Sequence, residues 1–257
     1  MIIGITGASG QLARRTADLV LEHVEPSNLV LVTRDPSKLA DYAARGVSVR
    51  QGDFDQPDGL PAAFAGIDRL LLISASDLGR RVLQHVAAIE SARTARVGHI
   101  VYTSIVNPTP NNPSVAAQEH LATEAALRAS GLRWTFLRHS IYADIQARFL
   151  LDALPSGRYV HNYGEGMTAF VARDDCAAVA AAVLHTDGHA SQAYDVTGRE
   201  PFTHAETATI LASETGTELP VTAVDDDDRP LLHGSRIRTR CGGLLLSAWR
   251  FGAESMA

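Results

Sequence analysis

The chain has 257 residues, 46% of them hydrophobic and 20% charged, and a formal net charge of -6. That length and apolar content suffice for the core of one α/β domain, and the acidic balance argues against a nucleic-acid partner. The two cysteines, Cys176 and Cys241, form no metal-ligand pair and fit a reducing cytoplasm, and no apolar run is long enough to span a membrane.

The chain opens on an apolar run over residues 2–5, which predicts a short buried strand and argues against a signal peptide. Gly7-x-x-Gly10-x-x-Ala13 follows at once, and a helical period starts at Gln11. A strand, a glycine turn and a helix are together typical of a dinucleotide-binding fingerprint, with a plain βα turn as the alternative. Gly7 would permit the tight turn, and Gly10 would let a pyrophosphate approach the helix amides. The expected cofactor contacts here are Gly7, Ser9, Gly10, Gln11 and Leu12.

The second predicted strand, residues 29–33, ends at Arg34. NAD-preferring proteins usually carry an acidic residue there, whereas an arginine accommodates the 2′-phosphate of NADP. Asp35 is better explained as the N-cap of a helix that begins at Pro36. Lys38 lies one turn further and would join Arg34 at the phosphate, unless both are solvated surface charges. We therefore expect NADP as the cofactor, with NAD as the alternative.

The third predicted strand, residues 47–51, leads into Asp53 and Phe54. Asp53 would accept a hydrogen bond from the adenine amino group, with Phe54 packed beside the ring. The alternative is that Asp53 only caps a turn.

Small and polar residues follow the next two predicted strands, residues 69–73 and 99–103. Ligands of an open parallel sheet bind beyond the carboxyl ends of its strands. We therefore expect the middle of the cofactor to cross this edge, in contact with Ser74, Ala75, Ser76 and Thr103.

Helices are predicted at 80–95 and at 115–130. The apolar face of the first is expected to consist of Val82, Val86 and Ile89. A sixth strand at 134–137 runs into His139 and Tyr142, which would then lie at the same sheet edge. The alternation of strands and helices predicts an α/β fold with a Rossmann-like, doubly wound parallel sheet.

The pattern is weaker in the second half, where a capping box at Thr203-x-x-Glu206 marks one helix start. We interpret residues 1–155 as an NAD(P)-binding Rossmann domain and 156–257 as a small C-terminal substrate cap, not an independent domain. The arginine-rich tail, 225–257, does not resemble the rest, and no structure is predicted for it.

Six stretches carry a resemblance to a known family: residues 5–12, 32–36, 70–74, 99–104, 119–124 and 170–175. Through them the sequence resembles an atypical short-chain dehydrogenase/reductase of the NmrA-like group, and is similar to type 2 NAD(P)H:quinone oxidoreductases and triphenylmethane-dye reductases. The resemblance spans 1–224 and implies a Rossmann fold and a dinucleotide cofactor. The group also includes regulators that bind a dinucleotide without turning it over, so the resemblance defines the fold better than the activity.

Two residues depart from the pattern of this group. Ala13 replaces the commoner third glycine, a mild change because the position accepts glycine or alanine. His139 stands where the group often has asparagine, which implies an altered substrate pocket.

Lys38 is the only lysine in the chain. Standard short-chain dehydrogenases use a Tyr-x-x-x-Lys pair, in which the lysine lowers the pKa of the tyrosine. Arg34 stands at the required spacing before Lys38, and Tyr142-x-x-x-Gln146 keeps the tyrosine without the cation. An unassisted tyrosine has a pKa of about 10, so reversible oxidation of a simple alcohol is disfavoured.

A quinone needs less assistance, because the charge delivered with hydride spreads over an aromatic ring. Positioning against the nicotinamide would supply much of the rate, and hydrogen bonds to the developing oxyanion would add to it. The predicted catalytic donors are His139, Tyr142 and Ser104, with Ser74 as a further candidate and His139 as the best proton donor near neutral pH. The alternatives are a turn residue at His139 and an aromatic pocket wall at Tyr142. The histidines expected at the surface or in turns are His161, His185 and His204.

Our leading hypothesis is a cytoplasmic NADPH-dependent oxidoreductase that transfers hydride to a quinone, with no metal. The lysine-poor composition is typical of GC-rich coding, as in actinobacteria, and suggests a polycyclic aromatic polyketide substrate, such as a hydroxyanthraquinone, in antibiotic biosynthesis. The alternative is a redox-sensing regulator that binds NAD(P) and a partner protein without turnover. A third hypothesis is a reductase of an imine, an enone or a nucleotide sugar. The chain is also a candidate homodimer.

Overall fold

The computed structural model describes residues 1–224, which divide into two compact units. Unit 1 consists of Met1–His139 and Asp174–Val196, and unit 2 of Ser140–Arg173 and residues 197–224. The boundary expected at residue 155 lies inside unit 2, because the chain leaves the sheet after His139 and later returns to it with a further helix and strand. The tail at 225–257 lies outside the described residues.

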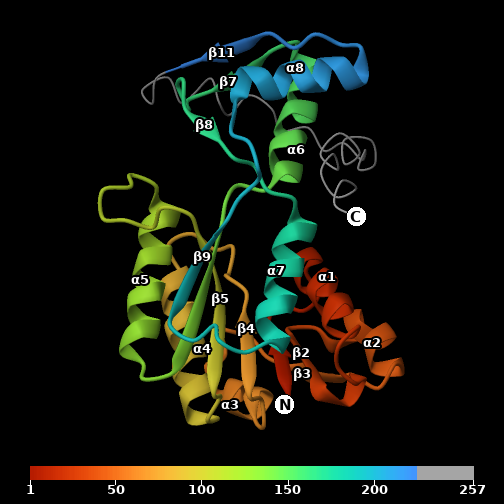
Figure 1. Cartoon of the computed structure of the whole chain (residues 1–257), viewed down its shortest axis with the longest axis vertical. Helices are drawn as coiled ribbons and strands as arrows, with labels where there is room; N and C mark the ends of the chain where they lie inside the picture. The colour runs from red at the N-terminus through yellow and green to blue at the C-terminus, as the bar shows by residue number, and fades with distance from the viewer. Residues whose placement is uncertain (225–257) are drawn as a thin grey trace. The chain divides into compact units, whose positions relative to one another are not determined.

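Unit 1 is built on a seven-stranded sheet in the order β3-β2-β1-β4-β5-β6-β9, with parallel pairing throughout (Figure 1). Its strands are β1 (Ile3–Ile5), β2 (Leu29–Thr33), β3 (Ser48–Gln51), β4 (Arg69–Leu72), β5 (His99–Ile105), β6 (Arg133–His139) and β9 (Gln192–Val196). The order runs outward from β1 in both directions, and β1 and β2 are buried along their whole length. The predicted Rossmann-like, doubly wound fold is confirmed.

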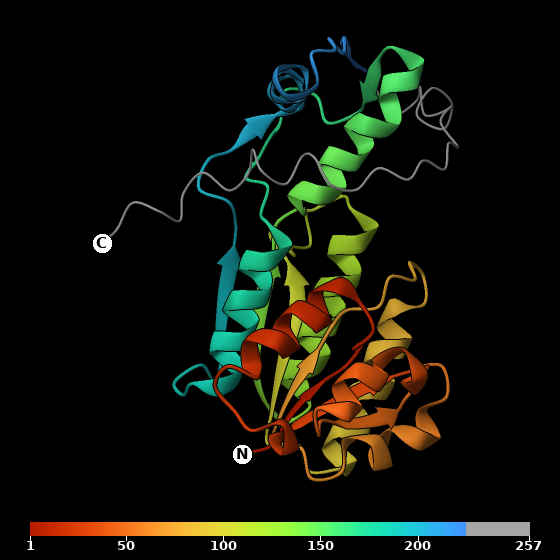
Figure 2. The ribbon, with the colours of Figure 1, turned by 90° about the vertical axis from the view of Figure 1, so that its right-hand side faces the viewer.

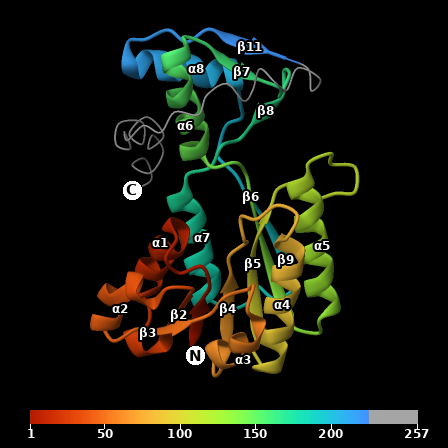
Figure 3. The same cartoon turned by 180° about the vertical axis from the view of Figure 1, so that it is seen from behind.

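Helices cover both faces of this sheet (Figures 1 and 2). They are α1 (Gln11–Val20), α2 (Ala40–Ala44), α3 (Leu60–Phe64), α4 (Arg81–Thr94), α5 (Val115–Ala129) and α7 (Arg173–His185), with 3-10 turns at Pro26–Asn28, Pro36–Leu39 and Pro57–Gly59. Helices α3, α4 and α5 pack side by side on one face (Figure 3). On the other, α1 and α7 are neighbours, since the rings of His23 and His185 stack with centroids 4.0 Å apart. Among the described residues, no helix is both long and apolar enough to cross a membrane.

One apolar core of the described residues lies between the sheet and helices α3 to α5. It joins Leu70 and Ile100 of the central strands to Phe64, Leu127 and Phe136, all fully buried. Burying a side chain of this size stabilises the fold by about 1.5–3 kcal/mol.

The buried side of α4 is polar in its first turns and mostly apolar further on, which corrects the apolar face expected from the sequence. Val86 is 38% exposed and Val82 is only half-buried, so Ile89 alone of the three expected residues packs in the core. Gln84 and His85 are buried instead. The reason is that the start of α4 packs against backbone amides of the preceding loop, which need polar partners.

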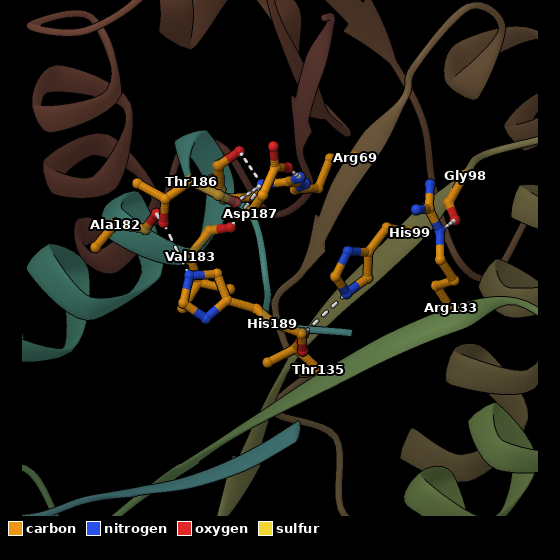
Figure 4. Close-up of polar contacts among 11 residues, drawn as sticks. Arg69, Gly98, His99, Arg133, Thr135, Ala182, Val183, Thr186, Asp187 and His189 are labelled. Atoms are coloured by element: carbon orange, nitrogen blue, oxygen red, sulfur yellow. Dashed lines mark hydrogen bonds and ion pairs between the residues drawn. The ribbon is translucent and has the colours of Figure 1, made fainter. Parts of the chain in front are cut away.

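The returning segment is anchored to the amino end of the sheet by Arg69, at the start of β4 (Figure 4). Its buried guanidinium donates to the carbonyls of Val183 and Leu184, each at 2.9 Å, and to that of Thr186. The last carbonyls of a helix have no partners within it, so a cation there satisfies them and opposes the helix dipole.

A second anchor holds the start of β9 against β6. The hydroxyl of Thr135 donates to the carbonyl of His189 at 2.6 Å, and Nε2 of His99 lies 2.8 Å from the same hydroxyl (Figure 4). Because the Thr135 proton is used by the carbonyl, Nε2 of His99 is the donor in the second bond.

Unit 2 has a small core of its own. Its elements are α6 (Ala143–Ala153), a 3-10 turn at Leu154–Ser156, β7 (Tyr159–His161), β8 (Met167–Thr168), β10 (Phe202–Thr203), α8 (His204–Thr215) and β11 (Val221–Ala223). Strand β7 pairs parallel with β11, and β8 pairs antiparallel with β10. Leu150, Tyr159 and Leu211 pack in its core. The predicted capping box of Thr203 and Glu206 is confirmed.

Four rings form a cluster in unit 2, which we call the ring cluster: Tyr159, His161, Tyr163 and His204. It corrects the expectation that His161 and His204 lie at the surface. His161 and His204 are 5% and 2% exposed, not at the surface, and their ring centroids lie 4.8 Å apart. Tyr163 stacks on His204 at 4.0 Å with ring planes 5° apart. The sequence could not show this, because the rings meet only when β7 and α8 pack together.

Candidate functional site

The glycine turn between β1 and α1 has the conformation that a phosphate cradle needs. Gly7 has φ +60°, in the left-handed region that favours glycine. The N–H of Gly10 donates to the carbonyl of Gly7 at 2.9 Å, and a Cβ at Gly10 would lie only 3.2 Å from that oxygen. Within the described chain, α1 has neither a side-chain cap nor an acidic residue in its first turn. Its N-terminus therefore suits an anion.

The other members of this turn differ in what they can offer. Ser9 and Gln11 are exposed, whereas the side chain of Leu12 is buried. Leu12 can therefore contact a cofactor only through its backbone N–H. The hydroxyl of Thr33 lies 3.4 Å from that of Ser9 and links the turn to the end of β2.

Arg34 and Lys38 are both exposed just beyond β2. Between them, Asp35 accepts from the hydroxyl and the N–H of Ser37 at 2.6 and 3.1 Å, and the hydroxyl bond lowers the pKa of Asp35. Asp35 therefore caps the N-terminus of the 3-10 turn at Pro36–Leu39, as the sequence predicts. The two cations flank the end of the strand, where a 2′-phosphate is recognised in this fold.

A third cation in this region was not identified from the sequence. Arg14 of α1 donates to the carbonyl of Lys38 and pairs with Asp41 at 3.1 Å. Its position on a helix far earlier in the chain carried no signal that pointed to the phosphate.

The turn after β3 supports a structural role for Asp53. Its Oδ1 accepts from the N–H of Asp55 at 3.0 Å, and its carbonyl accepts from Gln56 at 3.0 Å. The half-buried ring of Phe54 packs edge-on against His85, with centroids 6.5 Å apart. An adenine contact from Asp53 would use one of the remaining acceptor sites of its carboxylate.

The ends of β4 and β5 meet, as the sequence predicts. The N–H of Ser74 donates to Oγ1 of Thr103 at 2.9 Å. The hydroxyl of Thr6, directly after β1, accepts from the backbone N–H of Ile73. Ala75 is half-buried and Ser76 exposed. These residues therefore share one sheet edge with the glycine turn.

Ser104 is bound to a fully buried carboxylate. Its hydroxyl donates to Oε1 of Glu124 at 2.8 Å. Arg138 donates to both oxygens of Glu124, at 3.0 and 2.8 Å, and Arg128 adds a contact at 3.1 Å. Because its only proton is held by a carboxylate, Ser104 has no donor to offer a substrate oxyanion. The geometry argues against its expected catalytic role.

His139 ends β6 and is 4% exposed. Burial lowers its pKa to about 4, so the imidazole is neutral near pH 7. A neutral imidazole donates one N–H hydrogen bond but is not the ready proton source that an ordinary histidine would be. His139 can therefore donate a hydrogen bond, but it is not the proton donor near neutral pH that the sequence suggests.

Tyr142 and Gln146 belong to unit 2 and have different surroundings. The guanidinium carbon of Arg173 lies 4.9 Å from the ring centroid of Tyr142, and Arg173 pairs with Asp144 at 2.9 Å. The side chain of Gln146 is buried and lies 3.2 Å from Nδ1 of His204. The position where a lysine would assist the phenol thus serves the core of unit 2. The cation against the ring of Tyr142 is Arg173, at the start of α7.

The fold and these residues define a class of protein. A doubly wound sheet with a glycine turn at the N-terminus of its first helix, and exposed cations after its second strand, is a pyridine-nucleotide-binding domain. A family model described as NAD(P)H-binding matches residues 7–187, and the chain belongs to this family.

Individual relatives agree with that assignment. Quinone oxidoreductase 2 of Escherichia coli (strain K12) is 34% identical over 227 residues, which cover 88% of this chain and 79% of the relative. An NmrA-like family domain-containing oxidoreductase of Aspergillus flavus is 29% identical over 230 residues, which cover 87% and 75%.

Two solved structures are similar along most of the chain. The triphenylmethane reductase of Citrobacter sp., complexed with NADP(H), has a TM-score of 0.83 at 33% identity and covers 91% of this chain and 82% of its own. The NADPH-dependent quinone oxidoreductase of Escherichia coli, complexed with NADPH, has a TM-score of 0.85 at 33% identity, with 90% and 81% covered. The predicted resemblance and cofactor class are confirmed, and the chain is an NAD(P)H-dependent oxidoreductase.

Proposed function

We propose that the chain is an NADPH-dependent reductase that transfers hydride to a quinone-type acceptor. The observation that carries this proposal is the burial of Gln146 in unit 2, where a lysine would have to stand to assist Tyr142. Lys38, the only lysine, lies beyond β2. An acceptor that is reduced without a lysine-assisted phenol fits this arrangement, and the quinone and triphenylmethane reductases among the similar proteins support it.

We infer that NADPH lies along the carboxyl edge of the sheet in unit 1 and supplies the hydride. The glycine turn would hold the pyrophosphate, and Arg34 with Lys38 would hold the 2′-phosphate. Asp53 and Phe54 would contact the adenine. The remaining proposed contacts, along the middle of the cofactor, are Ser74, Ala75, Ser76 and Thr103.

His139 and Tyr142 are the proposed hydrogen-bond donors to the developing oxyanion. His139 would donate a neutral imidazole N–H. Tyr142 would donate its phenol O–H, and the guanidinium of Arg173 lies against its ring. Arg173 acts here through Tyr142, as a positioning residue.

We further propose that the acceptor is a planar aromatic molecule, such as a hydroxyanthraquinone in a polyketide tailoring step of antibiotic biosynthesis. Unit 2 supports this with exposed apolar side chains. Tyr163, Phe149 and Met167 are 47%, 50% and 57% exposed. Large apolar side chains that are exposed are available for contact with an aromatic ligand.

The decisive experiment follows NADPH absorbance with a panel of naphthoquinones and anthraquinones. We expect quinone-dependent oxidation, with kcat lowered by about tenfold or more in His139→Ala and in Tyr142→Phe. NADPH consumption that does not depend on a quinone would contradict the proposal. Tight NADPH binding without turnover of any acceptor would favour the redox-sensing regulator instead.

We also propose a cytoplasmic location and a homodimer. Cys176, which is buried, forms no disulfide within the described residues, and this is compatible with a reducing compartment. Helix α4 exposes Leu83 and Val86, which lie three residues apart on one face and would be covered in a dimer. Sedimentation equilibrium of the protein and of Leu83→Glu tests the dimer, which the charge should dissociate.

A further inference from the structure

The loop between β4 and α4 carries three of the proposed cofactor contacts, and buried side chains hold its backbone. The N–H of Ala75 donates to Nε2 of His85 at 2.9 Å, and the carbonyl of Ala75 accepts from Nε of Arg81 at 2.6 Å. The N–H of Gly79 donates to Oε1 of Glu119 on α5 at 2.6 Å. Backbone groups near both ends of the loop are therefore bound by α4 and α5.

Arg81 and Glu119 form a buried ion pair. Their nitrogen and oxygen lie 3.0 Å apart, and the side chains are 9% and 10% exposed. Desolvation offsets most of the Coulomb gain of a buried pair, so such a pair is a poor source of stability by itself. Each partner also binds a loop backbone group, which indicates that the pair sets the loop conformation.

The hydrogen bonds assign the tautomer of His85. Because Nε2 accepts from a backbone N–H, the ring proton is on Nδ1, which donates to Oγ1 of Thr123 at 3.0 Å. The Thr123 hydroxyl in turn donates to the carbonyl of Glu119 at 2.9 Å. Burial, with the charges of His120 and Arg81, lowers the pKa of His85 to about 3, so the ring stays a neutral acceptor.

The same loop is joined to the turn after β3, where the adenine contacts are proposed. The amide of Gln84 donates to Asp55 at 3.0 Å and to Asp77 at 3.3 Å. Arg80 pairs with Asp55 at 2.8 Å. Two segments on the proposed path of the cofactor are thus linked through the start of α4.

We propose that Arg81, His85 and Glu119 form a polar clamp that holds the loop after β4 in the shape that binds NADPH. They are positioning residues, since they act through the backbone of Ala75 and Gly79. When a binding-competent shape is only partly populated, the apparent affinity falls by the same fraction. The clamp rests on the proposed contacts of this loop with the cofactor, but not on the nature of the acceptor.

The test compares His85→Leu, which removes the acceptor for Ala75, with His85→Gln, which offers an amide oxygen in its place. Glu119→Gln is a second clamp variant. The matched control is Ser91→Ala on the same helix, where a buried hydroxyl donates to the carbonyl of Ala87 at 2.7 Å. We measure the Kd of NADPH by fluorescence titration, steady-state kinetics, and trypsin cleavage of the cofactor-free protein at Arg80.

In His85→Leu we expect the Kd and the KM for NADPH to rise by about tenfold, with kcat at saturation within about twofold. Cleavage at Arg80 should accelerate, and His85→Gln should restore both properties to within about threefold of wild type. Ser91→Ala should match wild type.

Unchanged cleavage and an unchanged Kd of NADPH in His85→Leu and Glu119→Gln would overturn the clamp. Faster cleavage with an unchanged Kd would show that the loop does not serve the cofactor and would also overturn it. The clamp and the acceptor can fail separately. If the clamp variants bind NADPH more weakly as expected but the protein reduces no quinone, the clamp stands and the proposed acceptor is refuted.

Discussion

The two units fix their buried histidines in different ways. In unit 1, His85 binds a backbone N–H and His99 binds a threonine hydroxyl. In unit 2, His161 also accepts a backbone N–H, that of Tyr163 at 3.2 Å, and Nδ1 of His204 lies 3.1 Å from the hydroxyl of Tyr159. In addition, the rings of His161 and His204 lie against each other, and Tyr163 stacks nearly parallel on His204. A hydrogen bond requires a narrow range of distance and angle, whereas offset rings keep their attraction over a wider range of positions.

Directional hydrogen bonds thus hold buried histidines in both units, and unit 2 adds face-to-face ring stacking. The cofactor has the same form in every turnover, and unit 1 surrounds its proposed path with directional bonds. Four experiments test this contrast.

Acid should have the largest effect, and mostly on unit 1. Burial lowers the pKa of His85 to about 3 and those of His99, His120 and His139 to about 4. In the unfolded chain each histidine titrates near 6.5, at about its ordinary pKa, so below that pH the unfolded state binds more protons. Stability is therefore present above about pH 6.5 and is lost as the pH falls toward 4, by roughly 1.4 kcal/mol per pH unit for each such histidine.

Urea unfolding followed by circular dichroism at several pH values measures this loss. In unit 2, burial and the neighbouring His161 also lower the pKa of His204 to about 4. Hydrogen exchange, resolved by peptide, should show earlier loss of protection in unit 1. A free energy of unfolding that is constant between about pH 7 and 5 would contradict the lowered pKa values of the buried histidines.

Glu124→Gln should be the most damaging single substitution of the set. Glu124 is fully buried and binds Arg138, Arg128 and Ser104, so the change leaves a guanidinium without its charge partner. We expect a loss of about 3 kcal/mol in the free energy of unfolding, measured in urea. The control is Glu90→Gln, whose exposed pair with Arg93 should contribute less than about 0.5 kcal/mol. Equal losses in the two variants would contradict the special role of the buried carboxylate.

Arg34→Gln should weaken cofactor binding without affecting unit 2. If Arg34 meets the 2′-phosphate, the Kd of NADPH should rise by about tenfold while that of NADH stays the same. Titration with both nucleotides gives the ratio directly. A parallel loss for NADH would mean that Arg34 supports the fold around β2 and does not read the phosphate.

Tyr163→Leu should have the smallest effect. Tyr163 is 47% exposed, and its removal deletes the stack on His204, so we expect a loss of about 1 kcal/mol in thermal or urea unfolding. Met167→Ala, also exposed, removes a side chain of unit 2 without removing a ring and should change stability by less than about 0.5 kcal/mol. A loss in Tyr163→Leu as large as that in Glu124→Gln would remove the contrast between the units.

Several residues show where sequence reasoning was sufficient. The turn at Gly7 and Gly10, the cap at Asp35 and the box at Thr203 are local, so their neighbours in the chain are also their partners in space. The doubly wound parallel sheet followed from the alternation of strands and helices and the right-handed crossover rule. The placement of Ser74 and Thr103 at one sheet edge followed from the rule that parallel strands end at the same edge.

Other residues were misjudged because their partners are far away in the chain. Ser104 was expected to donate to a substrate, but its proton goes to Glu124 on the following helix. His204 was expected at the surface, yet it packs against Tyr163 and beside Gln146. Hydrophobic periodicity treats a polar residue as exposed, so it cannot find a polar side chain that is buried to bind a backbone amide, as His85 is.

Short-range order, set by glycine conformations, caps and apolar period, was thus enough to establish a pyridine-nucleotide-binding sheet from the residues alone. Packing between α4, α5 and the loop after β4 decided which polar groups are buried and which protons are already used. The reason is physical: a buried hydrogen bond depends on the position of two atoms in space, and only the folded chain brings Glu119 to Gly79.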